Sequence, residues 1–156
     1  MTLTDHHINK ESVLGYYVGR AFKAFNHKMH HKFESAGAEI QFDSWVKLFM
    51  FEQMGNRIQK DLAAFSGIHK ATITRTIDSL EEKGFVERIP DEADRRQNRI
   101  AVTQPGREII SRYIHLIEEG EKEILEGIPS DDVEICRGVL TKVWNNCQRN
   151  CEKLGE

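Results

Sequence analysis

A short segment near the middle of the chain combines small, hydroxylated and basic side chains with an apolar stripe. From residue 70 to about 83, apolar residues recur at spacings of four and three, which predicts a helix with one buried face. On the opposite side, its first two turns carry Ala71, Thr72 and Arg75, with Lys70 and Thr74 flanking them. These side chains are suited to base edges and phosphates in the major groove of DNA. Because Asp78, Glu81 and Glu82 at the other end would repel phosphates, we expect the helix to enter the groove N-terminus first.

A second cationic group lies in a polar loop at residues 90–98. The runs on either side, 85–89 and 99–102, alternate or are apolar, which predicts a short antiparallel pair from which the loop projects. Arg95 and Arg96 lie at the tip of this loop. They can reach the minor groove or the phosphates, because a guanidinium is weakly hydrated and forks onto paired acceptors.

The neighbouring segment completes a unit that positions both groups. Residues 56–66 predict a short helix whose Leu62 and Phe65 pack inward, and Gly67 supplies the unhindered backbone that the following turn needs. Helix, turn, helix and wing, at about 55–104, is the order of a winged helix-turn-helix. The usual work of that module is to hold double-stranded DNA.

Long helices with one apolar face are predicted on both sides of this module, at about 12–34, 42–53, 105–126 and 131–154. On the last of them, apolar positions at steps of three or four form a seam suited to another helix: Val133, Cys136, Leu140, Val143, Cys147 and Cys151. One copy of the module would contact about half of an operator, and DNA-reading helices usually come in pairs. We therefore expect a dimer.

The stretch 70–86, followed by Asp94-Arg95-Arg96 and then by Val-Thr-Gln-Pro-Gly at 102–106, closely resembles the MarR family of bacterial winged-helix transcriptional regulators. In that family the second helix of the module reads the major groove, and an Asp-x-Arg at the wing tip places its arginine in the minor groove. The resemblance thus implies that Asp94 orients the wing through ionic hydrogen bonds and that Arg96 is the minor-groove contact. His69 is a departure, because family members usually have a Ser or Thr cap there.

The resemblance also implies how the chain assembles and is regulated. The fold would be mainly α with a small β-wing, one domain over residues 1–156, with dimerisation helices at about 8–35 and 105–154. In the family these helices of two chains interlock as a homodimer. The expected function is a repressor that occludes a promoter at a palindromic operator, until an effector changes the distance between the two reading helices.

The aromatic residues of the first two predicted helices have two interpretations. At helical spacing they are suited to the core. They could also line a crevice between the dimerisation helices and the winged module, where family members often bind phenolic or other small anions. On this second interpretation the effector site comprises Tyr16, Tyr17, Trp45 and Phe49.

Histidines and cysteines raise the alternative of a metal- or thiol-gated repressor. His27, His30 and His31 have helical spacing, but Lys28 and Lys32 beside them make a solvated basic edge the competing interpretation, and we predict no bound metal or other cofactor. Cys147 and Cys151 are one turn apart, so a disulfide across a dimer competes with a role as small buried hydrophobic residues.

Composition agrees with a small cytoplasmic regulator. The net charge of −3 is unevenly distributed, since residues 57–107 hold ten Lys or Arg against eight Asp or Glu, whereas 118–134 are strongly acidic. Neither a signal pattern nor a membrane-spanning run is present, so we expect no membrane partner.

The sequence lacks a Gly-rich phosphate loop, a Gly-x-Ser-x-Gly elbow and a His-Glu-x-x-His motif, and we predict that the protein is not an enzyme. A winged-helix adaptor that binds protein is the alternative from another class.

Overall fold

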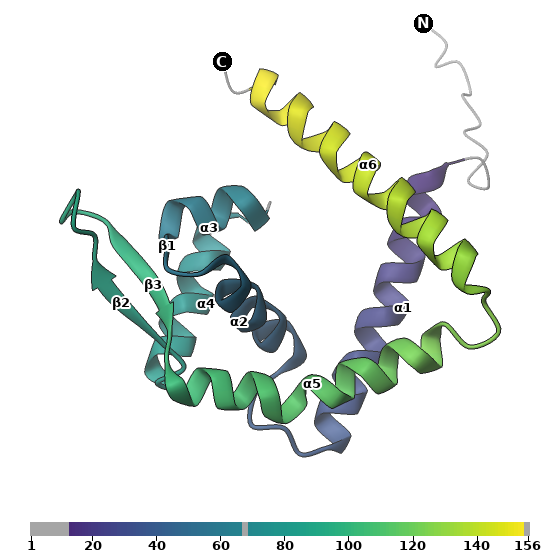
Figure 1. The fold of residues 1–156 in the computed structure, drawn as a ribbon, viewed down its shortest axis with the longest axis horizontal. Coiled ribbons are helices and arrows are strands. Elements are labelled where there is room, and N and C mark those ends of the chain that lie inside the picture. Colours follow the sequence, from purple (N-terminus) through teal and green to yellow (C-terminus); the bar gives the residue numbers. More distant parts are fainter. Residues whose placement is uncertain (1–12, 67–68, 155–156) are drawn as a thin grey trace, which may run out of the picture. The chain divides into compact units, whose positions relative to one another are not determined.

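The computed structural model describes residues 13–66 and 69–154, and it describes only the backbone of residues 63, 65, 66 and 150–154. The chain forms two compact units, Met1–Gly120 and Glu121–Glu156. The described elements are, in chain order, α1 (Leu14–Ser35), α2 (Phe42–Met54), β1 (Arg57–Ile58), α3 (Gln59–Ser66), α4 (Lys70–Glu82), β2 (Val86–Pro90), β3 (Asn98–Val102), α5 (Gln104–Ile124) and α6 (Ser130–Leu154) (Figure 1). The prediction of a mainly helical fold with a winged helix-turn-helix is confirmed.

The three strands form one antiparallel sheet in the order β1-β3-β2. The hairpin of β2 and β3 extends away from the helices of the first unit, as the projecting loop predicted (Figure 1). The prediction that residues 56–66 form one helix was wrong at its start, because Arg57 and Ile58 pair with Ile100 and Arg99 as β1. The free edge of β3 offers these two residues ladder hydrogen bonds, and this tertiary contact overrides their local helix propensity.

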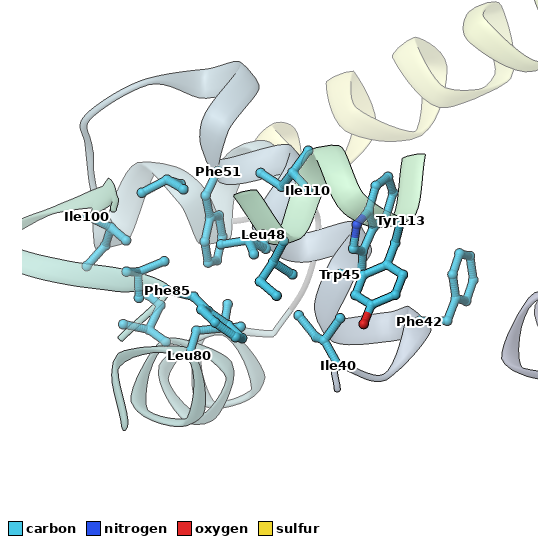
Figure 2. Packing of buried hydrophobic residues seen from close by; sticks show 14 of the residues in the cluster. Ile40, Phe42, Trp45, Leu48, Phe51, Leu80, Phe85, Ile100, Ile110 and Tyr113 are labelled. Atoms are coloured by element: carbon cyan, nitrogen blue, oxygen red, sulfur yellow. The ribbon is translucent and has the colours of Figure 1, made fainter. Parts of the chain in front are cut away.

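The core of the first unit joins α1, α2, α4 and α5 to the sheet. The predicted stripe of α4 is fully buried, since Ile73, Ile77 and Leu80 are at most 1% exposed. Leu62 of α3 is buried as predicted, whereas the side chain of Phe65 and the turn residue Gly67 lie outside the described part of the chain. Figure 2 shows the buried hydrophobic core between the sheet and the start of α2. Its labelled side chains are Ile100, Phe85, Leu80, Phe51, Leu48, Ile110, Tyr113, Trp45, Ile40 and Phe42.

The start of α5 is attached closely to the turn between α4 and β2. The Thr103 hydroxyl donates to the carbonyl oxygen of Gly84 at 2.6 Å, and the Thr103 amide donates to the carbonyl of Phe85 at 3.0 Å. A Cβ at Gly106 would lie 2.2 Å from the Phe85 carbonyl oxygen, so only glycine permits this approach of two backbones. The first turn of α5 is therefore packed directly against the backbone of the winged module.

The second unit consists of the end of α5, a turn and α6. Large apolar side chains on α6 are between 41% and 65% exposed: Ile135, Val139, Leu140 and Trp144. Cys136 and Cys147 are free and exposed, so in a single chain Cys147 does not have the role of a small buried hydrophobic residue. The side chain of Cys151 lies outside the described part. Within the described residues, the helices are too short or too polar to cross a bilayer.

Candidate nucleic-acid interface

The leading edge of α4 is exposed. Lys70, Ala71, Thr72 and Arg75 are all exposed; Ala71, Thr72 and Arg75 lie away from the buried stripe, and Lys70 flanks them at the start of the helix. His69 precedes the helix without a side-chain cap hydrogen bond, which agrees with its departure from the family pattern. A helix start without a side-chain cap leaves amide donors and the positive end of the dipole available to an acceptor such as a phosphate oxygen.

Thr74 is half-buried, and its hydroxyl is hydrogen-bonded within the protein. Its hydroxyl donates to the carbonyl oxygen of Lys70 at 3.0 Å and accepts a hydrogen bond from the amide of Gln59 at 2.8 Å. This hydroxyl therefore links α3 to α4, and its predicted contact with DNA remains a prediction. Gln59 was missed, because a contact across 15 residues has no periodic signal in the sequence.

The wing loop is organised around Asp91, which is only 3% exposed. One of its carboxylate oxygens accepts hydrogen bonds from the amides of Ala93 and Asp94, both at 2.9 Å, and the other is paired with the guanidinium of Arg99. Asp91 was not among the predicted site residues. An acid that follows a proline at the start of a polar loop is typical of such a turn and was the available signal.

Asp94 holds the tip of the wing. Its two carboxylate oxygens accept hydrogen bonds from the amide of Arg96 at 3.0 Å and from the side chain of Gln97 at 2.9 Å. Both Arg95 and Arg96 are exposed at this tip. The hydrogen bonds of Asp91 and Asp94 thus hold the loop together, and the side chains of Arg95 and Arg96 are exposed to solvent.

The same hydrogen bonds keep both acids charged. The pKa of Asp91 is lowered, first by the hydrogen bond from the Asp94 amide and then, against the cost of burial, by Arg99 and the Ala93 amide. The pKa of Asp94 is lowered by the Gln97 side chain and then by the Arg96 amide. The closed loop is therefore the form in which both carboxylates are ionised.

Two arginines attach the base of the wing to the rest of the unit. Arg99 on β3 also donates to the backbone carbonyl of Asn56 at 3.0 Å. Arg88 on β2 forms ion pairs with Asp78 and Glu81 of α4. The acids predicted to repel phosphates at the C-terminal half of α4 are therefore partly neutralised by a residue of the wing.

Within one chain, the four residues assigned to an effector pocket do not come together. Tyr16 and Tyr17 are 40% and 50% exposed on α1, whereas Trp45 is 3% exposed in the core and stacks on Phe49 at 5.4 Å. Trp45 contacts Phe33 of α1, and at 1.5 Å per residue Phe33 lies roughly 25 Å along the helix from Tyr16. Within one chain this corrects the expectation of a single pocket. Helical spacing shows which face of a helix a residue lies on, but not which residues of another helix lie at the same position along its axis.

A hollow of about 130 Å³ lies at the end of α1 and the start of α2, lined by His30, Phe33, Glu34, Ala38, Ile40, Gln41 and Phe42. His30 is 3.4 Å from a carboxylate oxygen of Asp43, and His31 shares a hydrogen bond with Ser35 at 3.3 Å. Among the described residues, no three His, Cys, Asp or Glu side chains are grouped to hold a metal ion. His30 and His31 are thus each engaged with another side chain.

Comparisons with known proteins point to one family. A family model described as MarR family matches residues 43–97, from the start of α2 to the wing. A crystal structure of a transcriptional regulator (MarR family) from Rhodococcus sp. RHA1 is 25% identical, with a TM-score of 0.74 over 83% of this chain and 92% of that chain.

Two further solved structures carry ligands. CouR from Rhodococcus jostii RHA1, bound to p-coumaroyl-CoA, is 24% identical, with a TM-score of 0.72 over 86% of this chain and 93% of that chain. A cysteine-to-serine mutant of MarR from E. coli, complexed with operator DNA, is 20% identical, with a TM-score of 0.77 over 86% and 96%. At these identities, the two structures show a shared fold.

Proposed function

Because residues 43–97 match a model of the MarR family, we propose that the chain is a transcriptional regulator of this family, which binds a palindromic operator as a homodimer and represses transcription until a small-molecule effector releases it. One observation carries the proposal. The exposed leading edge of α4 and the arginine tip of the wing occur in one unit, and the wing is attached to the C-terminal half of α4. A helix for the major groove and a guanidinium for the minor groove together contact half of an operator.

The dimer is supported by apolar surface that a single chain leaves open. On α1 and the residue before it, exposed apolar side chains comprise Val13, Leu14, Tyr16, Tyr17, Val18 and Phe22. The exposed side chains of α6 described above form a second apolar surface. Exposed apolar faces of this extent mark interfaces between proteins. Two chains related by a two-fold axis would read the two halves of a palindrome, and the whole chain would act as one domain in the cytoplasm.

The effector is proposed to be a phenolic or other small anion. The relative bound to p-coumaroyl-CoA is a precedent for a ligand with a phenolic group on the same fold, although coenzyme A makes that ligand larger. Of the predicted effector residues we retain Trp45 and Phe49, because among the described side chains Trp45 has the buried polar atom without a hydrogen-bond partner, its indole nitrogen. A buried donor of this kind gains from an acceptor. An effector would release DNA only by binding the DNA-free arrangement more tightly.

Selection of bound fragments from random double-stranded DNA tests the function directly. We expect an enriched palindrome whose half-sites are about one helical turn apart, which would establish DNA recognition and two-fold symmetry together. Retention that falls steeply with rising salt is expected for phosphate contacts, whereas a protein-binding adaptor need not show it. Purified protein that retains no duplex in dilute buffer would contradict the proposal.

A further inference from the structure

One flank of α4 carries polar side chains that point to other elements rather than to solvent alone. Thr74, Asp78 and Glu81 have the spacing i, i+4 and i+7, which places them on one side of the helix. Thr74 is bound by Gln59 of α3. Asp78 and Glu81 are bound by Arg88 of β2. The N-terminal half of the flank is therefore attached to α3 and the C-terminal half to the wing.

The attachment to the wing is more specific than a surface ion pair. The Arg88 guanidinium uses one nitrogen for each carboxylate, and the backbone amide of Arg88 also donates to Glu81 at 3.1 Å. The Arg88 side chain is only 23% exposed, against 38% for Glu81 and 52% for Asp78. A forked guanidinium with two charged acceptors resists rotation, which a single Lys could not do.

We propose that Arg88 is a positioning residue that sets the angle of the wing against α4, so that the wing tip and the leading edge of α4 contact one DNA duplex together. The inference rests on the function proposed above. It assigns to Asp78 and Glu81 a positive contribution to DNA binding, although their charge by itself opposes the phosphates.

The length of the hairpin makes this angle important. Five residues separate Arg88 from the middle of the wing loop, so at about 3.3 Å per residue a rotation of about 10° at the base moves the tip by about 3 Å. A displacement of that size removes a hydrogen bond from a guanidinium to DNA. Simultaneous contact of α4 and of the wing tip with DNA therefore depends on how rigidly Arg88 fixes the base of the hairpin to α4.

Neutralising Glu81 distinguishes this proposal from a simple charge effect, because the two explanations predict opposite changes in operator affinity. If Glu81 only repels phosphates, Glu81→Gln tightens operator binding; if it anchors Arg88, Glu81→Gln weakens it. We expect the operator affinity of the full-length protein to fall by about tenfold in a fluorescence titration. Glu82→Gln is the matched control, since Glu82 is exposed on the same helix and removes the same charge. We expect it to leave the affinity unchanged or slightly higher.

A double-mutant cycle tests the mechanism through the wing tip. Arg88→Met and Arg96→Ala should each weaken operator binding. The double variant should lose less binding free energy than the sum of the two single losses, because a misplaced wing no longer brings Arg96 into contact with DNA. The active fraction of each protein is first titrated at stoichiometric concentrations, so that partial unfolding is not mistaken for weak binding.

The outcomes are separable. Wild-type protein that binds no duplex contradicts the proposed function itself. If the wild type binds but Glu81→Gln binds as tightly or more tightly, or if the effects of Arg88→Met and Arg96→Ala add fully, the positioning role of Arg88 is overturned.

Discussion

At the scale of single residues, the adjacent side chains of Thr74 and Arg75 on α4 differ in their surroundings. The hydroxyl of Thr74 is used within the protein, whereas Arg75 is exposed on the leading edge. The same division occurs in the wing, where Asp94 binds the backbone and Arg96 projects. The residues that would touch DNA are thus few, and each can be tested alone.

Arg75→Ala should weaken binding to the selected operator by about 1–3 kcal/mol, the value of a guanidinium that reads a guanine edge. Its effect on unrelated duplex should be smaller, because base contacts carry the sequence preference. Lys83→Ala, at the other end of α4, is the control and should change operator affinity little. Equal losses on operator and unrelated DNA would show that Arg75 contacts only phosphates.

Arg96→Ala should weaken binding to operator and unrelated duplex to a similar degree. The slope of log affinity against log salt should fall by about 1, since one cationic contact is lost. Arg149→Ala on α6 removes the same charge outside the winged module. A slope that changes equally in both variants would mean that net charge, rather than the wing contact, is responsible.

The closed wing loop should depend on pH in the acid range. Because the pKa values of Asp91 and Asp94 are lowered in the folded protein, their ionised forms stabilise the loop above the ordinary carboxyl value of about 3.9. That contribution is lost as the pH falls from there through the lower folded values. NMR spectra recorded between neutral and acid pH should show the amides of Ala93, Asp94 and Arg96 shifting only below about pH 4. Shifts centred near neutral pH would contradict this account.

At the scale of elements, the winged module is held together by contacts between segments rather than by propensity alone. The flank of α4 is attached to α3 and to β2, and β3 is paired on both edges. The start of α5 lies against the backbone at Phe85, because Gly106 has no side chain. This last contact makes α5 continuous with the winged module.

Gly106→Ala should lower the stability of the protein, because its Cβ would lie 2.2 Å from a backbone oxygen that cannot move independently. A cost of about 1–3 kcal/mol is expected for such overpacking. The thermal unfolding midpoint should fall by several degrees, at about 2–4 °C per kcal/mol. Gly138→Ala on α6 is the control, since nothing lies within 4 Å of its Cβ, and alanine there should maintain or raise the midpoint. Equal midpoints for Gly106→Ala and wild type would refute the close approach.

At the scale of the whole molecule, charge and apolar surface are distributed differently along the chain. The segment that contains the winged module carries a positive balance, and the residues from 118 to 134 are acidic. Helix α6 exposes apolar side chains that a stable monomer would be expected to cover. Both features support the proposed dimer and its proposed binding to DNA.

Leu140→Glu should weaken the proposed dimer, because it places a charge on the predicted seam of α6, where the leucine is 41% exposed in the single chain. Sedimentation velocity should show a dissociation constant raised by at least about tenfold, with operator affinity reduced in parallel. Asn145→Glu, on the polar side of the same helix, should leave both unchanged. A wild-type protein that sediments as a monomer, or a Leu140→Glu variant that dimerises like wild type, would argue against this interface.

The sequence by itself determined the buried stripe of α4, its exposed basic edge and the projecting wing, because these depend on periodicity and on residues close together in the chain. Only the tertiary structure decided that residues 57–58 form a strand, that Thr74 binds Gln59 and that Arg88 binds Asp78 and Glu81. It also separated Tyr16 from Trp45 in the single chain, although both are aromatic and lie on helices. Periodicity specifies which face of an element is buried, whereas the partner of that face is chosen by packing between segments distant in sequence.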